Sequence, residues 1–88
     1  MLSIRESSAF KRDIKRLKRG NFDLSKLAAI IIRLANKEKL EERHSDHLLS
    51  GNWRGYRECH IKPDGLLIYR IEGDELQLAR TGSHSELF

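Results

Sequence analysis

The first half of the chain shows two hydrophobic periods in succession. Leu2 and Ile4 alternate with polar residues, a period of two that predicts a short strand ending before Ser7. Apolar residues then recur at intervals of three and four in two sets: Phe10, Ile14 and Leu17, followed by Leu24, Leu27, Ala28, Ile31, Leu34 and Ala35. The pattern therefore predicts a strand followed by a hairpin of two helices.

Residues suited to helix ends stand beside both periodic segments. Ser7 or Ser8 can accept a hydrogen bond from the first turn of the first helix, and Asp23 can do the same for the second. Gly20 is expected to take the left-handed conformation that ends the first helix. Residues of both charges follow the second helix over 37–43, so a solvated helix end and a loop are expected there.

The second half changes to a period of two and predicts a β-hairpin. The segment from Trp53 to Ile61 is rich in aromatic and alternating residues and is expected to be a strand. Lys62-Pro63-Asp64-Gly65 has the residues of a tight turn. The return strand over 66–71 is almost entirely apolar, which is typical of a strand in the middle of a sheet.

A third strand is expected after the turn at Gly73-Asp74, over 76–80, and residues 81–88 are expected to leave the sheet as a tail. This order of elements predicts an α+β fold. The N-terminal strand and the helical hairpin would pack on one face of a mainly antiparallel sheet of about four strands. The opposite face of such a sheet is then left for function.

Length and composition limit the class of protein. The 88 residues, 39% of them hydrophobic and 34% charged, suit one folded domain spanning 1–88. Cys59 is the single cysteine, which excludes an intrachain disulfide and favours a reducing cytoplasm. The longest apolar run, over 27–32, is far shorter than the roughly 20 residues of a membrane span, and no secretory signal is recognisable, so neither membrane insertion nor export by that route is expected.

The charge balance favours an anionic partner. Seventeen Lys and Arg residues stand against thirteen Asp and Glu, a net charge of +4. Nucleic acid is the first candidate partner and an acidic protein is the second. Much of the positive charge lies on the outer faces of the first predicted helix, which on its own is most often a solvated surface.

Residues able to cleave RNA gather in the second half of the chain. Histidines stand at 44, 47, 60 and 84, in the same half as Asp64 and Arg80. Cleavage of RNA without a metal needs a base for the 2′-hydroxyl, an acid for the leaving 5′-oxygen and a cation over the phosphate. Histidine, carboxylate and arginine are suitable for these tasks. The alternative, from the pattern alone, is a scattering of surface histidines.

A zinc site is a weaker alternative for the same residues. His44 and His47 could combine with Cys59 and His84, but structural zinc needs four tetrahedral ligands. On a strand, Cys59 points away from the face that His60 shares with Glu58, so Cys59 is interpreted as a core residue and His44 as a surface residue. No metal and no cofactor are expected.

Several linked motifs carry a resemblance to a known family. They are Asp46-His47, Leu49-Ser50-Gly51-Asn52-Trp53-Arg54-Gly55-Tyr56-Arg57, His60-Ile61-Lys62-Pro63-Asp64, Leu67-Ile68-Tyr69, Arg80-Thr81-Gly82-Ser83-His84 and Leu87-Phe88. Together they resemble the YafQ branch of the RelE/ParE toxin superfamily over nearly the whole chain. The resemblance implies a RelE-like fold.

The resemblance also implies a function. Members of that branch are toxins of type II toxin-antitoxin systems, small endoribonucleases that cut mRNA in the ribosomal A site and are silenced by a cognate antitoxin. The toxin with its antitoxin can also bind operator DNA. The expected partners are therefore an antitoxin, the ribosome with its mRNA and, through the complex, DNA.

By the same resemblance, four residues are expected to be catalytic. His84 is assigned as the general acid, His60 or Asp64 as the base that takes the 2′-hydroxyl proton, and His47 as a support for one of these tasks. Arg80 is expected near the scissile phosphate and Phe88 against a base beside the cut. The residues expected to contact ribosomal RNA phosphates are Lys11, Lys15, Arg16, Lys18 and Arg19.

Two other function classes stay open at this point. One is a non-catalytic basic binding module or a gyrase poison of the ParE type, which loss of the histidine and acid set would favour. The other is a regulator that acts with its antitoxin at a promoter, a role compatible with the nuclease. Because the histidine and acid set is present, the sequence favours the nuclease.

Overall fold

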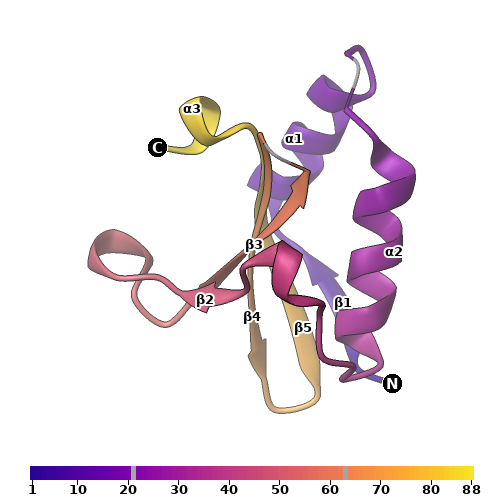
Figure 1. The fold of residues 1–88 in the computed structure, drawn as a ribbon, viewed down its shortest axis with the longest axis vertical. Coiled ribbons are helices and arrows are strands. Elements are labelled where there is room, and N and C mark those ends of the chain that lie inside the picture. Colours follow the sequence, from indigo (N-terminus) through magenta and orange to yellow (C-terminus); the bar gives the residue numbers. More distant parts are fainter. Residues whose placement is uncertain (21, 63) are drawn as a thin grey trace.

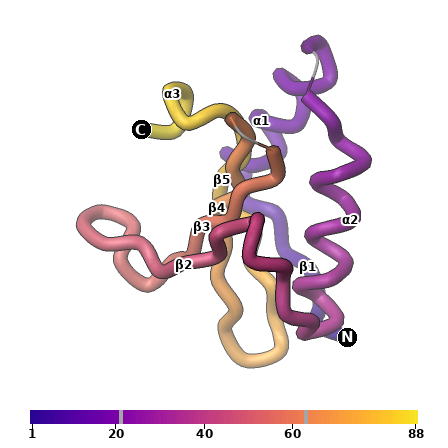
Figure 2. Tube along the Cα trace, in the orientation of Figure 1, coloured from indigo at the N-terminus to yellow at the C-terminus, as the bar shows by residue number. Residues whose placement is uncertain are grey.

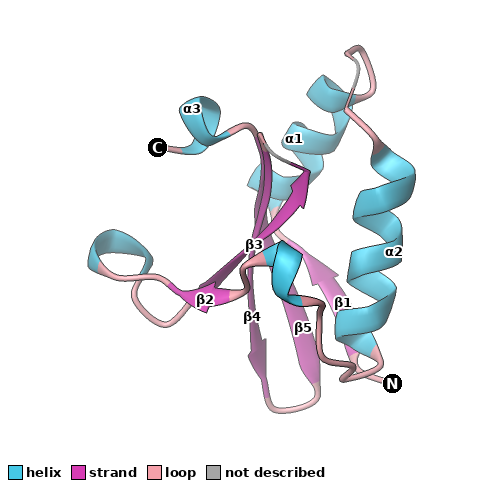
Figure 3. Cartoon of the chain, in the orientation of Figure 1, coloured by secondary structure: helices cyan, strands magenta, loops and turns pink. Residues whose placement is uncertain are grey.

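The computed structural model describes residues 1–20, 22–62 and 64–88. Helices and strands follow one another in the order shown in Figures 1 and 3. They are β1 (Ser3–Glu6), α1 (Ser8–Leu17), α2 (Leu24–Ala35), the 3-10 turn η1 (Glu42–His44), β2 (His47–Leu48), the 3-10 turn η2 (Gly51–Trp53), β3 (Arg57–Lys62), β4 (Gly65–Glu72), β5 (Glu75–Gly82) and α3 (His84–Leu87). The predicted order of strand, two helices and a meander is confirmed.

The strands form one sheet in the order β1-β5-β4-β3-β2. β4 is the middle strand, as its apolar run predicted. Neighbours β5, β4, β3 and β2 are antiparallel, whereas β1 runs parallel to β5. The sheet has one strand more than expected, because β2 consists of two residues and is too short to show a period in the sequence.

Helices α1 and α2 cover one face of the sheet, and the trace in Figure 2 shows α3 and the segment from β2 to η2 on the other side. Between the helices and the sheet lies a core that includes Phe10, Leu27, Leu34, Leu67 and Leu78. Each lies in one of the helices or strands that the sequence predicts. Burial of this apolar surface is the main force that holds the helices on the sheet.

Both predicted N-terminal caps are confirmed. The Ser7 hydroxyl accepts a hydrogen bond from the amide of Phe10 at 2.9 Å, and the Asp23 carboxylate accepts from the amides of Ser25 and Lys26. Ser7 also binds the sheet, because its hydroxyl donates to the carbonyl of Ala79 at 2.7 Å. The start of α1 is therefore fixed to β5.

The predicted left-handed end of α1 at Gly20 is wrong. The helix ends with Lys18 in the ordinary right-handed region. Its last carbonyls are satisfied by tightened turns, in which the amides of Arg19 and Gly20 donate to Arg16 and Leu17. A left-handed glycine is not needed when the helix ends in such turns.

The hairpin of β3 and β4 is confirmed, although Pro63 of its expected turn lies outside the described residues. The first strand of the hairpin begins at Arg57 rather than at Trp53. Gly55 has a φ of 94°, which interrupts extended backbone, and Trp53 belongs to η2. Trp53 and Tyr56 pack edge to face at 5.3 Å and are half-buried outside the main core.

The C-terminal residues do not form an extended tail. Thr81 and Gly82 continue β5, and 84–87 form α3, which begins with a capping box between Ser83 and Glu86. A helix of four residues is too short to produce a hydrophobic period. In the described part of the chain, no helix has the length and apolar character needed to cross a membrane.

Candidate active site

The register of the sheet brings candidate residues into one row across four strands. His47 on β2 lies opposite Glu58 on β3, which lies opposite Ile68 on β4, which lies opposite Arg80 on β5. Directly opposed residues project from the same face of a sheet. Three strand spacings of about 4.8 Å put the ends of the row about 14 Å apart.

A second row lies beside the first, toward the hairpin end of the sheet. His60 on β3 lies opposite Leu66 on β4, which lies opposite Gly82 on β5. Leu66 and Ile68 are buried and form an apolar floor between β3 and β5. Two histidines therefore lie on the β3 side of this floor, and Arg80 and the start of α3 lie on its β5 side.

A buried carboxylate lies between the two histidines. Glu58 is 6% exposed, and its Oε1 lies 3.3 Å from Nε2 of His47 and 3.9 Å from Nε2 of His60. The Nδ1 of His47 faces the carbonyl of Ser45, which can only accept a hydrogen bond. Nδ1 of His47 therefore carries a proton, and Nε2 of the same ring is directed at Glu58.

His44 is buried next to the strand that carries His60, so its assignment to the surface is wrong. Only 8% of His44 is exposed, and its Nδ1 donates to the carbonyl of His60 at 2.7 Å. The reason is that η1 packs against β3, so the ring supplies a donor to a strand carbonyl. His44 thus fixes the backbone that carries His60.

Asp46, next to His47, anchors the short strand β2. Its Oδ1 accepts from Nε of Arg57 at 2.8 Å, and its Oδ2 accepts from the hydroxyl of Tyr69 at 2.6 Å. Burial and the bond to Asp46 raise the pKa of Tyr69 above its ordinary value. The bond to Asp46 likewise raises the pKa of Arg57. These bonds hold His47 beside β3.

Cys59 belongs to the core, as predicted. It is fully buried on the helical side of the sheet, and burial, with the nearby charges of Asp46 and Glu58, raises the pKa of its thiol to about 12. Among residues 1–20, 22–62 and 64–88, no group of three or more His, Cys, Asp or Glu side chains is arranged to hold a metal ion.

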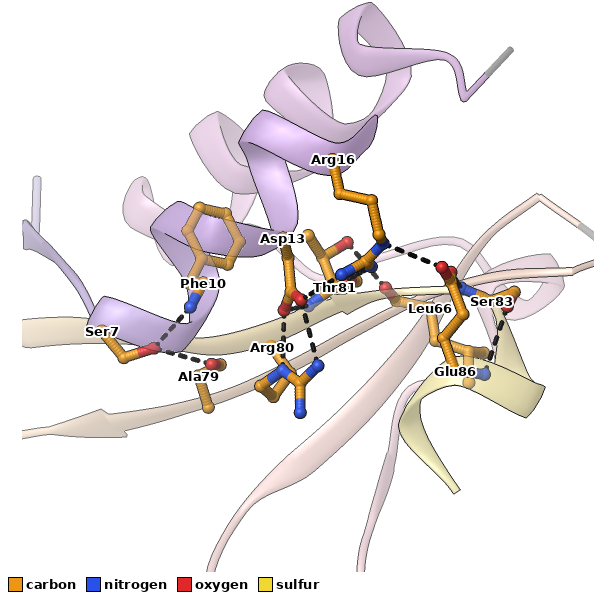
Figure 4. Close-up of polar contacts among 10 residues, drawn as sticks. All are labelled: Ser7, Phe10, Asp13, Arg16, Leu66, Ala79, Arg80, Thr81, Ser83 and Glu86. Atoms are coloured by element: carbon orange, nitrogen blue, oxygen red, sulfur yellow. Dashed lines mark hydrogen bonds and ion pairs between the residues drawn. The ribbon is translucent and has the colours of Figure 1, made fainter. Parts of the chain in front are cut away.

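Arg80 is held by a buried carboxylate on α1, as Figure 4 shows. Asp13 accepts from Nε of Arg80 at 2.7 Å and from Nη2 at 3.0 Å. It also accepts from the backbone amide of Thr81 at 3.1 Å, close to the bulge in the pairing of β4 with β5. The bond to Asp13 raises the pKa of Arg80. The two bonds from the guanidinium to Asp13 hold the cation at a defined place.

The C-terminal helix carries two further candidates. His84 and Phe88 lie with their ring centroids 5.2 Å apart, and Phe88 is 52% exposed. Asp64 is exposed in the turn between β3 and β4, at the same end of the sheet as α3, because Gly82 pairs with Leu66. The hairpin turn and α3 therefore border the same end of the site.

The basic residues expected to contact RNA are all exposed, on α1 and in the turn that follows it; they are Lys11, Lys15, Arg16, Lys18 and Arg19. Arg16 differs from a free surface cation, since it contacts Asp13 at 2.9 Å and Glu86 at 2.8 Å.

Glu58 was not among the candidates from the sequence, although its position on the same face as His60 follows from the alternation along β3. What the alternation does not show is that this carboxylate is buried between two imidazole rings.

The chain matches a known protein family over almost its whole length. The family model described as "Bacterial toxin of type II toxin-antitoxin system, YafQ" matches residues 2–88. The chain belongs to the YafQ family. The resemblance carried by the sequence motifs is thereby confirmed, and with it the expectation of a type II toxin.

Relatives of the YafQ family match in sequence and in structure. The chain is 36% identical over 86 residues to the mRNA interferase toxin YafQ of Escherichia coli K12, covering 97% of this chain and 94% of that protein. A copper-bound mutant toxin from Helicobacter pylori superposes with a TM-score of 0.94 at 46% identity, over all of both chains. YafQ in the Escherichia coli DinJ-YafQ complex superposes with a TM-score of 0.90 at 35% identity, over 100% of this chain and 99% of that one. The RelE-like α+β fold expected from the motifs is therefore confirmed.

Proposed function

We propose that this YafQ-family toxin is a ribosome-dependent endoribonuclease that cuts mRNA by general acid and base catalysis, without a metal. The observation that carries the proposal is the histidine pair around Glu58 facing Arg80 and α3 across the floor of Leu66 and Ile68. The name of the Escherichia coli relative, mRNA interferase toxin YafQ, supports the same substrate.

In the proposed reaction, His60 or Asp64 takes the proton of the 2′-hydroxyl, and the 2′-oxygen forms a bond to phosphorus. The bond from phosphorus to the 5′-oxygen breaks, and His84 gives that oxygen a proton. The products are a 2′,3′-cyclic phosphate and a free 5′-hydroxyl. His47 supports the base, since it shares the Glu58 carboxylate with His60.

Two further residues are proposed to bind the RNA at the cut. Arg80 lies over the scissile phosphate, with Asp13 holding Nε and Nη2 and so fixing the direction of the guanidinium. Phe88 stacks on a base next to the cut, a contact worth about 1 to 3 kcal/mol. Its exposed ring beside His84 supports this role.

Four exposed basic side chains on α1 and in the turn that follows it are proposed to contact ribosomal RNA phosphates; they are Lys11, Lys15, Lys18 and Arg19. Since much of the net charge of +4 lies on this helix, binding should weaken as salt concentration rises.

We propose a cognate antitoxin as the protein partner, because YafQ of Escherichia coli is found in the DinJ-YafQ complex. The positive charge of the chain favours an acidic segment in that partner, and the complex is proposed to bind operator DNA. Residues 1–88 are proposed to act as one domain in the cytoplasm, where translating ribosomes are found.

The test is cleavage of mRNA on translating ribosomes in the presence of EDTA, with wild type, His84→Ala and His60→Ala. Wild type is expected to cut in the A site, and both variants are expected to lose at least about 100-fold in rate. Lys39→Ala, on the loop after α2, is the control for handling and folding. Folded wild-type protein that makes no cuts would overturn the proposal and favour gyrase poisoning or simple binding.

A further inference from the structure

Arg16 links α1 to the C-terminal helix. Its Nη1 donates to Asp13 at 2.9 Å, and its Nε forms an ion pair with Oε2 of Glu86 at 2.8 Å, as Figure 4 shows. Its Nη2 reaches the carbonyl of Thr81 at 3.4 Å. The guanidinium is therefore engaged on three sides by the protein itself, unlike a cation kept free for RNA.

Glu86 has a double task at this junction. Its Oε1 accepts from the amide of Ser83 at 2.8 Å, which completes the capping box of α3, while its Oε2 binds Arg16. The hydrogen bond from the Ser83 amide and the charge of Arg16 lower the pKa of Glu86, so the carboxylate is ionised at neutral pH. One side chain thus both starts α3 and fixes it to α1.

The helix that is fixed in this way is too short to be stable by itself. It has four residues, and isolated helices below about 12 residues are marginal in water. The site residues His84 and Phe88 lie on this helix and at its end. Their positions therefore depend on what holds α3 to the rest of the molecule.

Gly82 provides the space in which Arg16 and Glu86 meet. A Cβ at this position would lie 2.8 Å from Nη2 of Arg16 and 2.9 Å from Oε1 of Glu86, and the φ of 150° also disfavours a side chain. The backbone of β5 therefore leaves room for this ion pair to lie over the end of the strand.

We propose that Arg16 is a positioning residue: with Glu86 it fixes α3 to α1, and so fixes His84 and Phe88 relative to His60. The inference rests on the proposed nuclease function and replaces the expectation that Arg16 contacts RNA. Both side chains of the pair are partly exposed, at 41% and 38%, so the pair matters less for global stability than for the place of α3.

Substitution of Glu86 distinguishes two alternatives for Arg16, a contact to RNA and the positioning of α3. If Arg16 were an RNA contact, Glu86→Gln would remove a negative charge beside it and would leave RNA binding unchanged or tighter. If Arg16 positions α3, Arg16→Ala and Glu86→Gln both lower the turnover number, by about 10-fold or more, since small misplacements of catalytic groups are costly. The double variant then loses no more than either single variant.

Two matched controls use residues of the same charge. Lys15→Ala removes a neighbouring exposed cation of α1 and is expected to raise KM with little change in turnover. Glu72→Gln removes an exposed acid at the β4–β5 turn, whose ion pair is with Arg70, and is expected to cleave like wild type. A Glu86→Gln variant with wild-type turnover, beside an Arg16→Ala variant that behaves like Lys15→Ala, would overturn the proposal.

A measurement on the free protein keeps the inference separate from the nuclease proposal. The ¹⁵N heteronuclear NOE of residues 84–88 is expected to match that of β5 in wild type and to fall in Arg16→Ala and Glu86→Gln, but not in the two controls. Unchanged values in Glu86→Gln, whose surface position should leave the fold intact, would refute the tether. Lowered values in a protein that cuts no RNA would refute only the nuclease.

Discussion

Asp13 on α1 binds Arg80 on β5 through both carboxylate oxygens, at 2.7 and 3.0 Å, although the two residues are 67 positions apart in the chain. Asp13 is 1% exposed. Burial alone would raise its pKa, but the bonds from Arg80, Arg16 and the Thr81 amide outweigh that cost and lower it. The folded protein therefore favours the ionised carboxylate.

Asp13→Asn should destabilise the fold by about 3 kcal/mol at pH 7, because it leaves the Arg80 cation without its counter-charge. The pKa of Asp13 in the folded protein lies below its ordinary value of 3.8. The ionised carboxylate therefore stabilises the fold at pH values above 3.8, and this stabilisation is lost as the pH falls through the folded pKa. Urea unfolding of both proteins at pH 7 and near pH 2 measures this. An equal difference at the two pH values would contradict it.

Tyr69→Phe should cost about 1 to 3 kcal/mol of unfolding free energy. The substitution removes the 2.6 Å bond to Asp46 and leaves one oxygen of that carboxylate without its donor. Tyr56→Phe, on a half-buried ring that contacts Trp53 and Arg70, is the matched control and should cost less. Equal urea midpoints for the two variants would show that the Asp46 bond contributes nothing.

Cys59 should resist thiol reagents in the folded protein. It is fully buried and its pKa is raised to about 12, so at pH 8 the reactive thiolate is both rare and inaccessible. Labelling with a chromogenic disulfide should be slow in buffer and complete within the mixing time in 6 M guanidinium, where roughly all structure is lost. Fast labelling of the native protein would contradict the burial.

Glu58→Gln should lower mRNA cleavage by up to about 100-fold with little loss of stability, because the amide keeps the volume but removes the charge to which His47 and His60 are directed. Both histidine rings can be followed by ¹⁵N NMR, which reports which nitrogen carries the proton. Wild-type cleavage, together with unchanged ring spectra, would mean that this carboxylate has no part in the reaction.

Much of the fold follows from local patterns in the sequence. The apolar residues that recur at helical intervals in α1 and α2 face the core, except Ala28, which is exposed, and the apolar run over 66–71 is the middle strand. Each prediction depends on neighbours within a few positions, where period and capping chemistry are decisive. Cys59 was assigned to the core by the same reasoning, from the alternation along β3.

The features that could not be predicted depend on partners distant in the chain or on very short elements. The burial of His44 could not be predicted, because it depends on a hydrogen bond to the carbonyl of His60, 16 positions away. β2 and α3 have two and four residues, too few for a period. The partners of Arg16 and Arg80 could not be predicted either, because a basic helix gives no indication of which cations will meet Asp13 or Glu86.

The parallel pairing of β1 with β5 has a consequence for the order of folding. Strands β3, β4 and β5 are joined by tight turns and can pair early, whereas Ser3–Glu6 must find Glu75–Leu78 across most of the chain. All four residues of β1 are exposed, so the strand itself buries little surface to compensate for closing that long loop, and the buried residue of this segment is Leu2 just before it. We therefore expect the N-terminal strand to join the sheet last and to leave it first, and its amides to exchange with solvent well before those of β4.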